Sequence, residues 1–281
     1  MILTKEQLKE YFERIDYTPG EDETPEQILR NLHVGHVSHI PYENLDTYRG
    51  MRIDLSDETL FDKQVRRKRG GYCFEMNGMF AMVLRSLGFN FKRVSARLNI
   101  TGDGFGAYMH CAAIVDIGEK RFIADVGCGS GGFAEPLEII PGHIHNVIGG
   151  TFRIVEDKKF GYVIQWKRSG SEELTDYMCV QDLEAMQGDF ELGSFYGDTH
   201  PTSKFRHTLM LAMTLPTLDG KVTLSDECVR ITRNGEAEII PHSTAEEINA
   251  ACLKYFGLDA PIPCIHPLAY ELEENAVPTI I

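Results

Sequence analysis

The spacing of apolar residues predicts helices at the start of the chain. Over residues 4–15 and 24–37, apolar side chains recur at every third or fourth position, as they do along one face of a helix. Thr4 and Thr24 each precede a glutamine by three residues, which is the spacing of a capping box at a helix start. Both segments are therefore expected to be amphipathic helices.

Two further helices are expected before the pattern changes. One runs from Ser56 to about Arg67. The other begins near Cys73, carries an apolar run and ends at Gly88, a good residue for stopping a helix. Residues 1–88 are therefore expected to form a helical subdomain.

From Phe91 onward the pattern changes to short runs that are typical of strands. The expected strands of the middle region cover residues 91–100, 108–117, 121–126, 151–155, 162–166 and 177–180. Short turns separate these strands, which predicts a barrel or a sandwich over residues 89–187.

Residues 188–281 form the last expected unit. Its expected elements are a short helix or loop at 188–197, strands at 205–215, 222–224, 228–231 and 237–240, and a helix that is capped at Thr244 and ends near Gly257. The tail after Pro261 is rich in proline and weakly patterned.

Composition excludes several classes of function. The 281-residue chain has a net charge of −14, which disfavours a general attraction to nucleic acid or to anionic membranes. It contains no apolar run of about 18 residues and begins without a signal-peptide pattern. Seven cysteines without a C-x-x-C pair make a zinc knuckle or a disulfide framework improbable, so we expect a cytoplasmic protein without a metal.

Cys73 is the candidate nucleophile. It follows the turn Gly70-Gly71 and lies in the first turn of an expected helix, where unpaired N–H groups and the helix dipole favour a thiolate. The two glycines would let the backbone approach a substrate closely. The alternative is that Cys73 is inert packing, as most cysteines are.

His110 and Asp125 are the candidate partners of this cysteine. A two-residue turn at Gly118-Glu119 would place Ile117 opposite Lys120, and each further pair one residue out on both strands, so that paired residue numbers sum to 237. In this register His110 and Asp125 lie on the same face of the hairpin, a diagonal step apart. A three-residue turn would put them on opposite faces. If they pair, one imidazole nitrogen remains free to take a proton from Cys73. A purely structural His–Asp pair would have the same pattern.

Four motifs, in order, resemble those of the arylamine N-acetyltransferases. They are Pro-Tyr-Glu-Asn-Leu at 41–45, Arg-Gly-Gly-Tyr-Cys-Phe-Glu at 69–75, His110, and Asp-Val-Gly-Cys-Gly at 125–129. The resemblance covers roughly residues 3–215. It implies an α+β fold with a cysteine-proteinase-like core: a helical bundle (1–88), a central β-barrel (89–187) and a C-terminal α/β lid (188–281). It also implies a catalytic triad of Cys73, His110 and Asp125.

The resemblance implies a ping-pong reaction as well. Acetyl-CoA would acetylate Cys73, CoA would leave, and the nitrogen of an arylamine, arylhydrazine or arylhydroxylamine would take the acetyl group. Two other classes of function stay open: a thioesterase, amidase or transglutaminase-like hydrolase that uses the same triad, and a binding module without catalysis.

Supporting residues are also expected around the cysteine. Arg69 and Glu43 would form an ion pair that fixes the cysteine turn, unless each is solvated separately. Asn77, one helical turn after Cys73, is placed to hydrogen-bond near the triad.

Two binding regions are expected from the same motifs. Backbone N–H groups of Gly127, Gly129, Ser130 and Gly131 would cradle the CoA pyrophosphate, although flexible glycine turns look alike. By resemblance, Tyr42, Phe133 and Phe205 would line the acceptor pocket; the alternative for each is ordinary core. Cys128 stands where phenylalanine is frequent in the family, so the pocket is expected to have a different shape.

Overall fold

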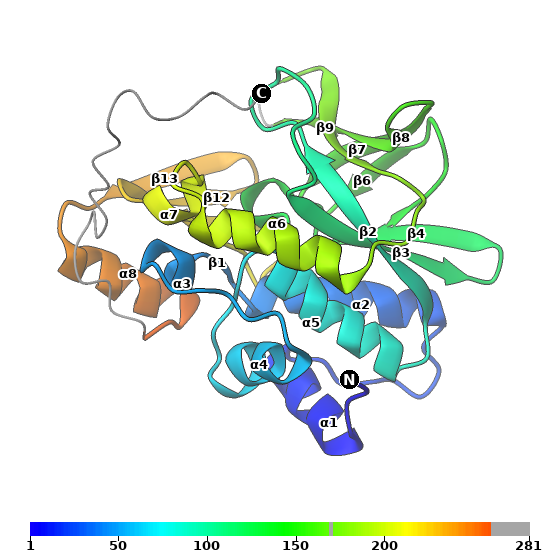
Figure 1. Ribbon diagram of the computed structural model, residues 1–281, viewed down its shortest axis with the longest axis horizontal. Helices are drawn as coiled ribbons and strands as arrows, with labels where there is room; N and C mark the ends of the chain where they lie inside the picture. The colour runs from blue at the N-terminus through cyan, green and yellow to red at the C-terminus, as the bar shows by residue number, and fades with distance from the viewer. Residues whose placement is uncertain (169–170, 260–281) are drawn as a thin grey trace.

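The computed structural model describes residues 1–168 and 171–259. Its N-terminal part is helical, as predicted (Figure 1). The helices are α1 (Lys5–Arg14), α2 (Pro25–His39), α3 (Leu45–Tyr48), α4 (Asp57–Phe61) with a π-helical turn (Asp62–Arg66) after it, and α5 (Cys73–Ser86). Both predicted capping boxes are present, at Thr4 and at Thr24.

Helix α5 is the buried axis of this part. Its residues from Cys73 to Leu84 are all buried, because apolar side chains cover every face of the helix. It packs on α4 at one side and on strands β2 (Asn90–Leu98) and β3 (His110–Ile117) at another. The first residue of α5 is therefore held between the helical part and the main sheet.

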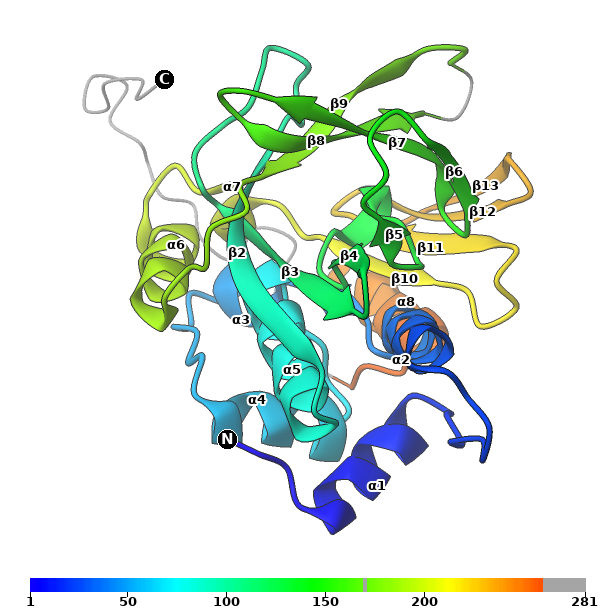
Figure 2. The same cartoon turned by 90° about the vertical axis from the view of Figure 1, so that its right-hand side faces the viewer.

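Strands β2 and β3 belong to an antiparallel sheet that, within the described residues, has eight strands in the order β5-β4-β3-β2-β9-β8-β7-β6. The other members are β4 (Lys120–Ala124), β5 (Leu137–Glu138), β6 (Ile144–Val147), β7 (Gly150–Asp157), β8 (Gly161–Lys167) and β9 (Leu174–Val180). The sheet curves until it is nearly closed, which confirms the predicted barrel (Figure 2). Sequence patterns missed β5 and β6, which are only two and four residues long.

A second sheet, of five strands within the described residues, has the order β1-β10-β11-β12-β13. Its strands are β1 (Tyr42–Glu43), β10 (Leu211–Thr214), β11 (Gly220–Leu224), β12 (Cys228–Arg233) and β13 (Glu236–Pro241). Helix α8 (Ala245–Phe256) packs against it, capped at Thr244 and ended by Gly257 as predicted. Because β1 comes from the N-terminal region, the chain limits of the three expected subdomains stay a prediction.

The segment before β10 corrects one prediction. Residues 205–215 were expected to form one strand, but Lys204–His207 form helix α7 and the strand begins only at Leu211. The Asn44 side chain donates to the carbonyls of Phe205 and Thr208 and accepts the N–H of Met210. These long-range bonds occupy backbone groups that a strand would use.

Two further predictions concern the last third of the chain. The helix or loop expected at 188–197 is a helix, α6 (Gln187–Thr199). The tail after Pro261 lies outside the described residues.

Among the described residues, no helix has both the length and the apolar character needed to cross a membrane.

A buried cluster of ion pairs ties α3, the π-helical turn and α5 together. Lys63 lies 2.6 Å from both Asp46 and Glu75, and Arg69 lies 2.8 Å from both Glu43 and Asp46. The predicted pair between Arg69 and Glu43 is thus confirmed. Although burial opposes the charged form of Lys63, the carboxylates around it raise its pKa. Lys63 therefore stays charged inside the protein, while burial raises the pKa of its partner Glu75.

Replacement of Lys63 by methionine is expected to destabilise the fold by about 3–5 kcal/mol, because it leaves Glu75 buried without a cation. The matched control is Lys9→Met, which removes the exposed pair with Glu13 and is expected to cost at most about 0.5 kcal/mol. Urea unfolding of the two variants measures the difference. Equal free energies of unfolding would mean that the cluster contributes little to stability.

Candidate active site

Cys73 is the first residue of α5, and its side chain is 2% exposed. Its sulfur lies 3.7 Å from the carbonyl oxygen of Met109, the residue before His110. Glu75 accepts the Tyr72 backbone N–H at 3.1 Å and so holds the turn that leads into the helix. The same Glu75 pairs with Lys63, so the ion cluster reaches the cysteine turn directly.

The glycine pair before Cys73 packs closely against other parts of the chain. A Cβ atom on Gly70 would lie 1.7 Å from the carbonyl oxygen of Pro41, so no larger residue fits there. Gly71 pairs with this neighbouring segment, accepting the Glu43 N–H at 2.9 Å. A Cβ atom on Gly71 would lie 2.6 Å from Glu75 Cβ, so this position also needs glycine. That the turn also approaches a substrate closely stays a prediction.

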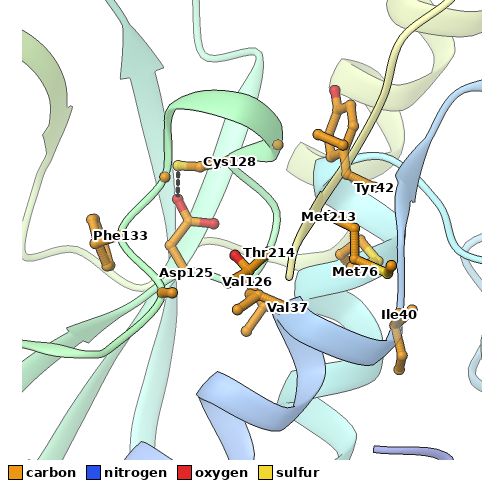
Figure 3. Close-up of a pocket in the computed structure, with 14 residues that line it drawn as sticks. Val37, Ile40, Tyr42, Met76, Asp125, Val126, Cys128, Phe133, Met213 and Thr214 are labelled. Atoms are coloured by element: carbon orange, nitrogen blue, oxygen red, sulfur yellow. Dashed lines mark hydrogen bonds between the residues drawn. The ribbon is translucent and has the colours of Figure 1, made fainter. Parts of the chain in front are cut away.

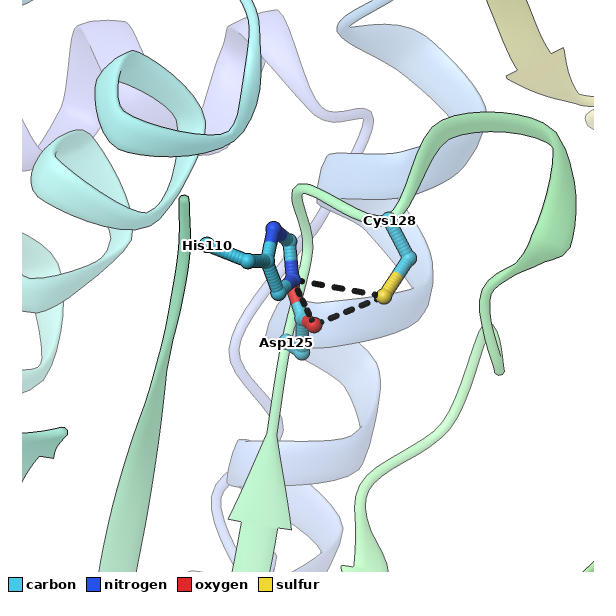
Figure 4. A group of neighbouring side chains, drawn as sticks. All are labelled: His110, Asp125 and Cys128. Atoms are coloured by element: carbon cyan, nitrogen blue, oxygen red, sulfur yellow. Dashed lines mark hydrogen bonds and ion pairs between the residues drawn. The ribbon is translucent and has the colours of Figure 1, made fainter. Parts of the chain in front are cut away.

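His110 and Asp125 are buried and paired (Figure 4). The distance between His110 Nε2 and Asp125 Oδ2 is 2.6 Å. The predicted hairpin register is confirmed, with Ala113 opposite Ala124 and Ile117 opposite Lys120. The two-residue turn therefore does place both side chains on the same face.

The carboxylate of Asp125 has partners on both oxygens. Oδ1 accepts from Asn77 Nδ2 at 2.9 Å and from the Gly127 N–H at 2.8 Å, while Oδ2 faces His110 and Cys128. Burial by itself would raise the pKa of Asp125, but His110 and these other partners lower it to about 2. Asp125 is therefore a buried carboxylate. The predicted hydrogen bond of Asn77 in this region is confirmed, with Asp125 as its partner.

Gly127 brings the two halves of the site into contact. A Cβ atom there would lie 2.7 Å from Cys73 Cα and 2.7 Å from Asn77 Nδ2. Only glycine therefore lets the segment after β4 pack directly against the start of α5. The N–H of Gly127 is already used by Asp125, so Gly127 cannot lend it to a phosphate-binding loop as predicted.

His33 supports the site and was missed by sequence reasoning. Its Nε2 accepts the Asp125 backbone N–H at 3.1 Å, and its Nδ1 lies 3.0 Å from the Ala134 carbonyl oxygen. Burial lowers the pKa of His33 to about 4, so the ring is neutral and can both accept and donate. No sequence signal marked this residue, because it is one of several histidines on α2 and its partners are about a hundred residues away.

The helix start does not make Cys73 a thiolate by itself. Burial raises the pKa of the Cys73 thiol, and the opposing hydrogen bond from the Phe74 N–H does not compensate for it. The helix start was expected to favour a thiolate, but burial outweighs this local effect. Loss of the proton to water is unfavourable, so activation requires a nearby base that takes the proton and leaves an ion pair.

Cys128 lies beside the His–Asp pair, which the sequence did not reveal. Its sulfur is 2.7 Å from Asp125 Oδ2 and 3.5 Å from His110 Nε2. The residues after it, Gly129–Gly131, form a short 3-10 turn, and the Lys221 ammonium donates to the Ser130 carbonyl. That Gly129, Ser130 and Gly131 bind CoA stays a prediction.

The three aromatic residues predicted to line the acceptor pocket are not all together. Tyr42 and Phe133 line a cavity of about 20 Å³ that also contacts Asp125 and Cys128 (Figure 3). Phe133 is only 1% exposed and stacks on His33, so it is mainly core. Phe205 packs edge-on against Tyr72, away from this cavity. Their roles toward a substrate stay a prediction.

A second, larger cavity lies beside Met109. It has a volume of about 440 Å³ and is lined by Met109, whose carbonyl contacts Cys73, together with Tyr108, Leu183, Leu192 and Tyr196. Its size falls in the range of small-molecule sites.

Comparison with known proteins identifies the family. A family model described as N-acetyltransferase matches residues 27–264. An arylamine N-acetyltransferase of Escherichia coli is 33% identical over 82% of this chain and 80% of its own length. The chain belongs to the arylamine N-acetyltransferase family. It is therefore an acyltransferase.

Solved structures of the family agree with this fold. The arylamine N-acetyltransferase of Salmonella typhimurium superposes with a TM-score of 0.85 at 28% identity, covering 94% of both chains. The enzyme of Mycobacterium marinum, solved in complex with CoA, superposes with a TM-score of 0.82 at 31% identity, covering 90% of this chain and 93% of that one. The predicted family and the predicted α+β fold class are thus confirmed.

Alkylation tests whether His110 activates Cys73. At pH 6.5 an ordinary cysteine is only about 1% thiolate. We expect iodoacetamide to label Cys73 faster than a free thiol in the native protein, and about 10–100-fold more slowly in His110→Gln, where the proton acceptor is lost. Peptide mass mapping gives the rate at each cysteine.

Cys111 serves as the control for this experiment. It is 1% exposed and its sulfur lies 3.6 Å from the Cys73 carbonyl, so it reports any local opening of the variant. Equal labelling of Cys73 in both proteins, with Cys111 still protected, would contradict activation by His110.

Proposed function

We propose that this protein transfers the acetyl group of acetyl-CoA to the nitrogen of an arylamine, arylhydrazine or arylhydroxylamine through an acetyl-Cys73 thioester. The observation that carries the proposal is the buried His110–Asp125 pair. His110 directly follows Met109, whose carbonyl oxygen contacts the Cys73 sulfur. Relatives named arylamine N-acetyltransferase, one of them solved with CoA, support the choice of substrates.

In the first half-reaction, His110 accepts the Cys73 proton on Nδ1 while Asp125 holds the hydrogen on Nε2 and stabilises the imidazolium. The Cys73 sulfur then attacks the thioester carbonyl of acetyl-CoA. The carbon–sulfur bond to CoA breaks, and the departing thiolate takes the proton from His110. The Cys73 N–H, at a helix start where no intrahelical acceptor exists, is the proposed donor to the oxyanion.

In the second half-reaction, the neutral nitrogen of the acceptor attacks the acetyl-Cys73 carbonyl. His110 takes a proton from the nitrogen and returns it to the Cys73 sulfur as the thioester bond breaks. Exchange between two thioesters is nearly isoenergetic, whereas an amide is more stable than a thioester. The second half-reaction therefore drives the overall transfer.

Binding of the two substrates is assigned to the surroundings of Cys73. Backbone groups of Gly129, Ser130 and Gly131 are proposed to contact CoA, and the neighbouring Lys221 adds positive charge at that turn. Tyr42 is proposed to contact the acceptor, with Phe133 and Phe205 shaping the walls behind it.

Release of free thiol from acetyl-CoA tests the proposed reaction. With an arylamine present we expect sustained release, and with acetyl-CoA alone one equivalent and an acetyl group on Cys73 by peptide mass mapping. Cys73→Ala should abolish both, while Cys228→Ala, on β12 in the second sheet, should behave like the native protein. Sustained release without amine would identify a hydrolase, and an acetyl group on Cys111 or Cys128 would overturn the choice of nucleophile.

Substitution of Asp125 by asparagine tests the triad. The amide cannot supply the charge that stabilises the imidazolium, and the corresponding change in a serine protease costs roughly 10⁴-fold in turnover. Because a cysteine is intrinsically the better nucleophile, we expect acetylation to fall by about 10²–10⁴-fold.

The matched control for Asp125→Asn is Asp116→Asn, which alters an acidic residue of the same hairpin that is paired with Arg121 at the surface. Thermal unfolding shows whether each variant remains folded. Near-native acetylation by a folded Asp125→Asn protein would reduce the triad to a Cys73–His110 dyad.

A further inference from the structure

Three different metal-ligand groups converge beside the nucleophile. His110 Nε2, Asp125 Oδ2 and Cys128 Sγ all lie within 4.8 Å of one another, and Figure 4 shows the three side chains pointing at a common centre. The pairwise distances are 2.6 Å from Nε2 to Oδ2, 2.7 Å from Oδ2 to Sγ, and 3.5 Å from Nε2 to Sγ. Imidazole, carboxylate and thiolate together form a typical donor set for zinc.

The distances suit a tetrahedral cation after a small movement. Bonds of about 2.0–2.3 Å to a tetrahedral ion place its ligand atoms about 3.3–3.6 Å apart. The Nε2–Sγ distance already lies in this range. Oδ2 is closer to both other atoms than that range, so it alone has to move, by about 0.8 Å.

Neighbouring groups hold two of the three ligands, Asp125 and Cys128, in place. Asn77 and the Gly127 N–H both bond Asp125 Oδ1 and leave Oδ2 for the centre. The buried Tyr177 hydroxyl hydrogen-bonds the Cys128 sulfur and favours its thiolate form. Burial and the Asp125 carboxylate nevertheless raise the pKa of this thiol, so a cation has to displace its proton. Such outer partners orient ligands and strengthen metal sites.

The cavity described above supplies a fourth position. Asp125 and Cys128 both line it, and its volume of about 20 Å³ is enough for one water molecule. Cys128 is partly exposed and is followed by the exposed Ser130, so a small ion can enter from this loop. Three protein ligands with one water is the arrangement of an open zinc site.

We propose that His110, Asp125 and Cys128 bind a borderline-soft divalent cation such as Zn²⁺, and that the bound ion switches the enzyme off. Binding releases the thiol proton of Cys128, because the thiolate is the ligand form. The ion occupies His110 Nε2, so the ring hydrogen moves to Nδ1. That nitrogen can then no longer accept the proton of Cys73. Asp125, bound to the ion, can no longer stabilise an imidazolium at His110.

The binding test uses a Cys73→Ser protein, so that the metal cannot bind the nucleophile. After dialysis against a chelator, the protein is titrated with Co²⁺ and the near-ultraviolet sulfur-to-cobalt absorption band is followed, with Zn²⁺ as competitor. We expect one equivalent to bind. In the double variant Cys73→Ser with Cys128→Ala, the band should disappear and the metal affinity should fall at least about 100-fold. Even the loss of a residue that only orients a ligand lowers metal affinity by about 10–100-fold.

The matched control is Cys73→Ser with Cys228→Ala, which removes a cysteine of similar exposure on β12 and should bind the metal normally. Circular dichroism verifies that each protein is folded. Absence of the band in Cys73→Ser would overturn the proposal, because the metal would then need the nucleophile. Persistence of the band in the Cys128→Ala variant would overturn it as well.

The inhibitory effect rests on the proposed function and is measured separately. Zn²⁺ at the concentration that saturates the site should abolish acetylation of Cys73 in the native protein, and a chelator should restore it. Because the cobalt titration needs neither acetyl-CoA nor amine, failure of the metal site and failure of the acetyl transfer are distinguishable. Full acetylation of a protein whose site is saturated would overturn the inhibitory role.

Discussion

The candidate active site depends on one buried carboxylate. Asp125 is 1% exposed, and a charge in that position is tolerated only when hydrogen bonds replace the water it has lost. Its four partners come from α5, from the start of β3 and from the loop that follows β4. The carboxylate therefore joins the helical part to the barrel at the point where the candidate nucleophile and base lie.

A second set of buried charges lies on the opposite side of the cysteine turn. Glu75 extends from α5 toward Lys63, while Asn77, two residues along the same helix, extends toward Asp125. The first turns of α5 are thus held from two sides by polar contacts inside an apolar core. This arrangement fixes the backbone of Cys73 without engaging its sulfur, which leaves that atom free for chemistry.

Local patterns were sufficient for much of this structure. Capping boxes, the helix start at Cys73 and the two-residue turn at Gly118-Glu119 are all set by residues close in sequence, so the helices and the His110–Asp125 register could be predicted. The family resemblance supplied the barrel.

Features that depend on long-range contacts could not be predicted. The helix at Lys204–His207 exists where a strand was expected, because Asn44 binds the backbone around it. His33 reaches Asp125 from 92 positions away. The pKa of Cys73 likewise depends on how deeply the folded chain buries it, which overrides the local effect of the helix start.

Strand β1 has a consequence for how the protein is made. Tyr42 and Glu43 are held on one side by Gly71, in the turn before the cysteine, and on the other by β10, about 170 residues further along the chain. Contacts between such distant segments form late, since a long loop has to close first. During synthesis Cys73 emerges early, but the turn that carries it lacks its outer strand until β10 has left the ribosome. The turn that carries Cys73 is therefore complete only once the chain as far as β10 has folded.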